Sequence, residues 1–257
     1  MKNRFLKLIL LVFLYMVTHI PNIFAKEIKL KATEILTREE GNVIIGNINA
    51  EAKIQNELEI YADKFTYNKE KDFLTAEGNV LAIDLLKNIK IKSNKIDFDR
   101  VKNKIYSHGK TFFDIKNNYK VNSENVNYLI NDGVLSSKKN TKVEDDLNNI
   151  INLNSFFYDD KIKVLKGKNI NMIDSEKNRY FLNQGMVKLD EYTLIGKDIK
   201  VLLDNKSFEH PENEPKLKGN SVIYKDNETL VKKGIFTSCK ENNNCPPWSI
   251  TSKEIKH

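Results

Sequence analysis

The side chains that most often carry catalysis or hold metals are few in this chain of 257 residues and lie far apart. The four histidines are His19, His108, His210 and His257. The sequence contains no G-x-S-x-G, H-E-x-x-H, P-loop or G-x-G-x-x-G motif. Carboxylates are plentiful, but most fall where an exposed strand position or a turn is expected. We therefore predict a protein that is not an enzyme, with no metal and no cofactor.

The two cysteines stand close together near the end of the chain, as Cys239 and Cys245. A zinc site is disfavoured, because two ligands at this spacing lack a second pair or a nearby histidine. In an oxidising compartment free thiols are disfavoured too. A local disulfide and pairing with cysteines elsewhere in a longer chain both remain open.

The N-terminus has the pattern of an export signal. Lys2, Arg4 and Lys7 precede a ten-residue apolar run over 8–17, which is too short to span a bilayer as a helix. Residues 1–25 are thus expected to form a signal peptide cleaved after Ala25, and the alternative is an uncleaved signal anchor. In both cases the chain is expected to be exported.

The body of the chain alternates apolar and polar residues, which is the pattern of half-buried strands. A motif of the form apolar-x-apolar-x-small begins at Ile28, Leu58, Ile89 and Tyr119, at spacings of 30, 31 and 30. Later copies include Tyr192 with Leu194. Each small residue is followed by a polar pair and a second alternating run, as in the sequence DKFTY over 63–67.

A unit of this length cannot bury its own apolar face, so stacked units must share one core. Glycines inside strands, such as Gly78 and Gly185, mark a bulge or a sharp bend where a strand passes between two sheets. We expect an all-β fold, a twisted β-jelly roll or rolled, solenoid-like antiparallel sandwich built from repeats of about 30 residues. Each repeat should give three short strands. Residues 143–151 should be a loop or a single turn, and 145–154 an insertion.

The positive charge gives little support for nucleic-acid binding. The formal net charge is +7, but only four of the 42 basic residues are arginines, the residue that nucleic-acid readers favour. The lysines are interleaved with carboxylates along the whole chain, which is typical of solvated strand faces. We therefore expect no nucleic-acid partner.

Taken together, these features resemble a known family. The closest match is the stretch LEIYADK over 58–64, continuing to AEGNV over 76–80, followed by the Cys239 to Trp248 segment. It is similar to the OstA-like domain shared by LptA and LptC, and to the N-terminal periplasmic part of LptD, the lipopolysaccharide (LPS) assembly protein of the outer membrane. The cysteine and tryptophan segment separates the LptD type from its soluble relatives.

The resemblance implies a jelly roll at 26–235 and, at 236–257, a segment leading to an outer-membrane barrel absent from this sequence. It implies LPS transport and assembly at the outer membrane, with acyl chains inside an apolar groove in the periplasm. The groove candidates are the inward pairs Leu58 and Ile60, Ile89 and Ile91, Tyr119 and Val121, and Tyr192 and Leu194.

Further implications concern the partners and the cysteines. Other Lpt bridge proteins would pair with the edge strands, and an outer-membrane lipoprotein would join if the barrel is present. In the family the cysteines of this domain pair with cysteines near the end of the barrel, which makes Cys239 and Cys245 disulfide candidates. Two alternatives remain. One is a complete soluble bridge protein of the LptA type, and the other is a β-solenoid surface adhesin or carbohydrate-active protein.

Overall fold

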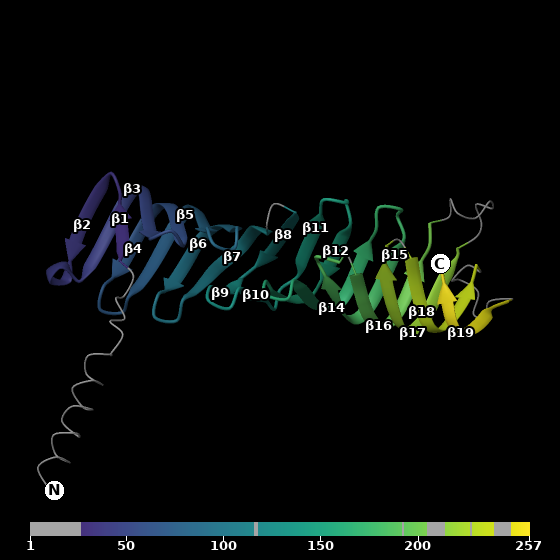
Figure 1. Ribbon diagram of the computed structural model, residues 1–257. Coiled ribbons are helices and arrows are strands. Elements are labelled where there is room, and N and C mark those ends of the chain that lie inside the picture. Colours follow the sequence, from purple (N-terminus) through teal and green to yellow (C-terminus); the bar gives the residue numbers. More distant parts are fainter. Residues whose placement is uncertain (1–26, 116–117, 192, 205–213, 227, 239–247) are drawn as a thin grey trace, which may run out of the picture.

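The protein is a long, narrow stack of antiparallel strands (Figure 1). The structure is a computed structural model and describes residues 27–115, 118–191, 193–204, 214–226, 228–238 and 248–257. In this part of the chain one short 3-10 helix, η1 (Glu39–Gly41), accompanies the strands and no α-helix occurs. None of the described residues belongs to a helix long and apolar enough to cross a membrane.

The strands follow one another along the stack in nearly their order in the chain. They are β1 (Ile28–Lys31), β2 (Glu34–Arg38), β3 (Val43–Ile54), β4 (Leu58–Asn68), β5 (Phe73–Asp84), β6 (Ile89–Asp99), β7 (Lys104–Ile115), β8 (Tyr119–Glu124), β9 (Asn127–Leu129), β10 (Val134–Ser137), β11 (Thr141–Asp145), β12 (Ile150–Leu153), β13 (Ser155–Asp159), β14 (Val164–Ile173), β15 (Arg179–Lys188), β16 (Thr193–Leu202), β17 (Lys216–Lys225), β18 (Glu228–Thr237) and β19 (Ile250–Lys256).

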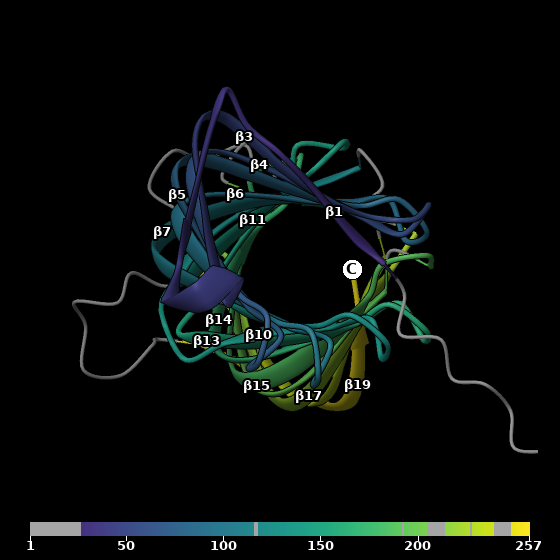
Figure 2. The same cartoon turned by 90° about the vertical axis from the view of Figure 1, so that its left-hand side faces the viewer.

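Most strands are long and bent in the middle, so that each contributes one half to each of two facing layers. We call the layer that contains 58–62, 80–84 and 89–93 the first layer, and the layer that contains 64–68, 73–77 and 95–99 the second layer. Viewed along the stack, the strands curl around a common core (Figure 2). The all-β, antiparallel jelly roll expected from the sequence is thus confirmed.

The repeat is built differently from our expectation in one respect. A unit of about 30 residues forms two bent strands, such as β4 and β5, and not three short ones. The predicted loop or turn at 143–151 is confined to 146–149, because β11 and β12 occupy the two ends of this stretch and pair with each other. Its acidic turn interrupts the alternation in the sequence, but the flanking residues Val143 and Ile151 still face the core.

At the bends of β4, β6 and β14 to β17 the inward face changes by one residue, whereas in β3, β5 and β7 the same alternate positions stay inward on both sides of the bend. In β4 the buried positions are Leu58 and Ile60 before the bend, then Phe65 and Tyr67 after it. In a flat strand such a slip would turn the second half outward. Here the strand turns a corner at the slip, so both halves face the same core.

In the N-terminal half of the stack, bulges and left-handed residues produce these corners. The β5–β6 pairing skips from Glu77 to Val80 on one strand and from Lys95 to Ser93 on the other, leaving an extra residue in β5. Gly78 and Asn79 there have φ of 78° and 46°, a conformation that glycine and asparagine tolerate best. The predicted link between in-strand glycine and a corner is therefore confirmed at Gly78.

Close packing at the corner of β17 makes Gly219 a test of this arrangement. A Cβ atom there would lie 2.3 Å from Val231 Cγ1 and 2.8 Å from the Lys232 carbonyl oxygen. We expect Gly219→Ala to lower the free energy of unfolding by about 1–3 kcal/mol, because overpacking forces backbone shifts. Urea denaturation followed by circular dichroism measures this. The matched control is Lys218→Ala at the exposed neighbouring position, and equal midpoints for the two variants would contradict the account.

Candidate functional site

The core of the first layer contains an apolar row that runs the length of the stack. Each member lies directly opposite the next on the neighbouring strand. The row, which we call the first track, consists of Leu30, Ala52, Ile60, Ala82, Ile91, Phe113, Val121, Val143, Ile151, Met172, Tyr180, Val201, Leu217 and Phe236. The only polar side-chain atom in it is the Tyr180 hydroxyl oxygen.

The second layer contributes a facing row, the second track, by the same rule of register. It consists of Ile44, Tyr67, Leu74, Phe98, Ile105, Tyr128, Leu135, Tyr158, Leu165, Val187, Leu194, Tyr224 and Thr229. The two tracks pack into one hydrophobic cluster. Near Phe113 and Leu165 they leave a cavity of only about 10 Å³, so the interior here is closed.

The predicted groove residues fall on or beside these tracks. Ile60, Ile91 and Val121 belong to the first track and Leu194 to the second. Leu58, Ile89 and Tyr119 form the neighbouring row of the first layer, one step closer to the turns. All seven are buried. Tyr192, Cys239, Cys245 and the cleavage position at Ala25 lie outside the described residues.

The two layers are joined at the bends and meet again at their turns, and we call this second line of contact the mouth. The first-layer turns include 84–89 and 145–150, and the second-layer turns include 99–104 and 159–164. Several tips of these turns carry exposed apolar side chains. They are Leu85, Leu86 and Leu147 on one rim, and Val101 and Ile162 on the other. Exposed aliphatic residues at two turn tips on each rim give the mouth apolar segments.

Hydrogen bonds from buried tyrosines cross the mouth at three points. The Tyr128 hydroxyl of the second layer donates to Asp84 Oδ2 of the first at 2.5 Å. The Tyr119 hydroxyl donates to the Leu189 carbonyl oxygen at 2.6 Å. Further along, the Tyr180 and Thr229 hydroxyl oxygens lie 3.2 Å apart. These three bonds, which we call the latches, hold the rims together from inside.

The acceptors of these tyrosines also organise the turns behind them. Asp84 Oδ1 accepts the backbone N–H groups of Leu86 and Lys87, and Lys87 Nζ lies 3.6 Å from Asp84 Oδ2. Asp174 repeats the arrangement, since it accepts the Tyr180 hydroxyl at 3.0 Å and the Asn178 N–H at 2.9 Å. A turn and the latch beside it therefore share one buried carboxylate.

Two crevices lead from solvent toward the interior at the centre of the mouth. One, of about 250 Å³, is lined by residues that include Asn118, Lys163 and Asp190. The other, of about 170 Å³, is lined by residues that include Leu147, Leu194 and Tyr224. Both reach Tyr119 and Leu189, the pair that bridges the rims. The two rims are thus packed least tightly on either side of the Tyr119 hydrogen bond.

Burial keeps the latch tyrosines protonated. It is the main cause of the raised pKa of Tyr128, and the hydrogen bond to Asp84 adds to it. Burial likewise raises the pKa of Tyr180 and Tyr158, and it raises that of Tyr224 to about 12. No group of histidine, cysteine or carboxylate side chains suited to a metal occurs among the described residues.

Our reading of the sequence missed the latch and the rims. It treated the tyrosines as ordinary inward residues and the turns as polar. A tyrosine next to a turn that carries an aspartate, such as Tyr180 near Asp174, is the signal that could have indicated the local bond. The Tyr128–Asp84 contact has no such signal, because 44 positions separate the partners.

The raised tyrosine pKa values predict loss of stability at alkaline pH. The unfolded chain releases a tyrosine proton near pH 10, while Tyr128 in the folded protein keeps its proton. The contribution of Tyr128 to the free energy of unfolding is therefore fully present below about pH 10 and decreases above it. We expect Tyr128→Phe to lower stability by about 1–3 kcal/mol at neutral pH, because Asp84 loses a buried donor. It should also reduce the alkaline slope by about 1.4 kcal/mol per pH unit.

Urea denaturation at a series of pH values measures both effects. Val143→Ala is the control, since it weakens the same core without removing a titrating group. If both variants keep the slope of the unmodified protein, the role assigned to Tyr128 is wrong.

Comparisons with known proteins give a structural likeness but no match to a family model or curated protein. Among solved structures, the chain is similar to LptH from Pseudomonas aeruginosa, described as the LptA homologous periplasmic component of the conserved lipopolysaccharide transport device. The likeness covers 45% of this chain and 84% of that chain, with 11% sequence identity and a TM-score of 0.40. At that distance the fold assignment rests on the strand pairings described above.

Proposed function

We propose that this protein is a periplasmic carrier of LPS and not an enzyme. Acyl chains would enter through the mouth and lie between the two tracks, leaving the sugars outside. The observation that carries this proposal is the first track, an unbroken row of apolar residues from Leu30 to Phe236. Along one side the interior is bordered by turns, several of which have apolar tips. The sequence resemblance to the LPS-assembly proteins supplies the identity of the lipid.

The tracks suit movement of a lipid along the stack. Their members are mostly aliphatic residues repeated at every strand, about 4.8 Å apart. Burial of acyl surface contributes about 25 cal/mol per Å² wherever it occurs along the row. Because neighbouring positions are chemically alike, no single position would hold the lipid much more tightly than the next.

The closed mouth is compatible with entry because the latches are weak. A hydrogen bond contributes about 1 kcal/mol net, so the three cross-mouth bonds together contribute about 3 kcal/mol. Transfer of each methylene group from water contributes about 0.8 kcal/mol. Burial of about four methylene groups would therefore offset the loss of the three hydrogen bonds. An acyl chain between the tracks would also replace the contacts that the two tracks no longer make with each other.

The two ends of the stack suit partners that extend it. β2 is exposed along its whole length and carries Ile35 and Leu36, both about half exposed. At the other end β19 pairs with β18 on one side, and its other edge has no strand beside it among the described residues. Further jelly-roll units, the Lpt bridge proteins of the resemblance, could add strands at these edges.

Within this function we favour the N-terminal part of an LptD-type protein, associated with the outer membrane, over a soluble LptA-type bridge. The support comes from the sequence of the Cys239 to Trp248 segment. At its end the Trp248 ring lies against Phe236, with centroids 5.8 Å apart, and Thr237 donates to the Trp248 carbonyl oxygen. Cleavage of the signal after Ala25, a disulfide formed by Cys239 or Cys245, and a lipoprotein partner belong to the same proposal.

Site-specific photocrosslinking tests the path of the lipid. A photoreactive residue at Ile91 or Val121 should crosslink to LPS in cells that make it, because both positions lie on the first track. The matched controls are the outward neighbours Lys92 and Asn122, which should give no crosslink. Equal labelling from inward and outward positions, or none from either, would refute the carrier function.

The rims offer a test that leaves the core intact. The triple change Leu85→Ser, Leu86→Ser and Ile162→Ser should slow LPS uptake several-fold, because acyl chains meet these exposed side chains first. Stopped-flow fluorescence with labelled LPS measures the rate. The control, Ile35→Ser with Leu36→Ser on β2, removes exposed apolar side chains away from the mouth. Equal rates for the rim and β2 variants would argue against entry at the mouth.

A further inference from the structure

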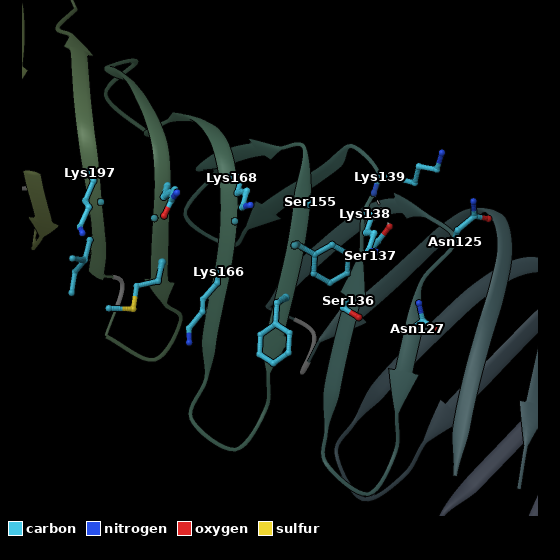
Figure 3. A pocket seen from close by; sticks show the side chains of 18 of the residues that line it. Asn125, Asn127, Ser136, Ser137, Lys138, Lys139, Ser155, Lys166, Lys168 and Lys197 are labelled. Carbon is cyan, nitrogen blue, oxygen red and sulfur yellow. Dashed lines mark hydrogen bonds between the residues drawn. The ribbon is translucent and has the colours of Figure 1, made fainter. Parts of the chain in front are cut away.

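A large hollow in the described part of the molecule lies on the outer face, away from both tracks. It has a volume of about 1010 Å³ and follows the second layer beside the bends, from β7 to β17. The side chains that define it, which we call the basic groove, are Lys138, Lys139, Lys166, Lys168, Lys197 and Phe157. Figure 3 shows its lysines and neutral polar residues on successive strands.

The groove faces outward because its strands alternate. In β14, Leu165 is buried in the second track while Lys166 and Lys168 on either side of Gly167 are exposed. The sheet therefore separates the groove from the apolar interior. A ligand in the groove does not compete with a lipid between the tracks, and this inference does not rest on the proposed function.

The groove is strongly positive and lacks compensating acids. Among the described residues that line it, five are lysines and none is aspartate or glutamate. None of the five forms an ion pair within the described part of the chain. Lysines elsewhere on the same layer do pair, as Lys163 does with Asp160 and Lys188 with Glu191. A cluster of unpaired cations in a concavity focuses a positive field and favours an anionic ligand.

The remaining lining indicates what kind of anion fits. Phe157 is 41% exposed and stands opposite Lys166 and Ser136 in register. Neutral amides and hydroxyls, including Asn127, Gln184 and Ser221, line other parts of the groove, together with the apolar side chains of Met186 and Ile195. An exposed ring offers an apolar face on which a sugar can lie, and amides and hydroxyls can exchange hydrogen bonds with sugar hydroxyls. An acyl chain would leave these polar groups unpaired, at a cost.

The shape of the groove favours a chain over a small ion. Its lysines span from β10 to β16, four strand steps, or about 19 Å at about 4.8 Å per step. We propose that the basic groove binds an acidic oligosaccharide, with lysines at its carboxylate or phosphate groups and a sugar face on Phe157. Its concavity disfavours a flat bilayer surface.

Binding of oligogalacturonate, a carboxylated glycan without lipid, tests the proposal by isothermal titration calorimetry on the full chain at low salt. We expect binding that weakens with added salt, and none of neutral maltooligosaccharide. Lys166→Gln with Lys168→Gln should weaken binding at least about tenfold, which corresponds to about 1.4 kcal/mol. Phe157→Ser should weaken it as well, since it removes the stacking surface while keeping every charge.

Controls separate a sugar site from general attraction to lysine. Lys69→Gln with Lys71→Gln removes the same charge from an exposed turn and, in titrations repeated at 0.1 M salt, should leave affinity within about twofold, since the Debye length there is about 10 Å. All altered positions are exposed, and unchanged urea midpoints would show that the variants fold. Absence of binding, equal binding of polyglutamate, or insensitivity to Phe157→Ser would each overturn the proposal.

Discussion

The structure depends on one constraint, the bend that each long strand makes between the two layers, at which the alternating pattern of β4, β6 and β14 to β17 slips by one residue. Side chains of a strand point to opposite faces in turn, so a slip reverses the inward face unless the strand itself changes direction. In β4 the slip falls between Ala62 and Phe65, and in β14 between Gly167 and Ile170. Each slip therefore requires a corner, and repeated corners in register require two facing layers.

Strand register repeats this arrangement along the length of the molecule. Since antiparallel neighbours place inward residues opposite each other, a repeat in sequence becomes two rows in space. The tracks are continuous although β8 to β13 are short and interrupted, because Val121, Val143 and Ile151 still lie opposite one another. An elongated apolar interior is thus produced by local pairing and needs no long-range signal in the chain.

The two long boundaries of the core differ in how they are closed. At the bends the chain is continuous, and residues such as Gly196 and Gly219 let side chains of the other layer approach the backbone. At the mouth the described residues join the layers through hydrogen bonds from side chains, chiefly those of Tyr128, Tyr119 and Tyr180. The layers are therefore joined by the covalent chain at the bends and by a few hydrogen bonds at the mouth. The mouth can open without loss of strand pairing.

The sequence by itself determined the fold class, the repeat and the inward positions. Alternation and corner residues are local properties, so Leu58, Ile91 and Val121 could be assigned to the core without a structure. What only the tertiary structure decided were the contacts between layers. The Tyr128–Asp84 latch, the apolar rims and the groove at Lys166 and Phe157 join residues from separate turns and strands. Their proximity depends on bend angle and stacking, which arise from packing of the whole roll and leave no periodic trace in the chain.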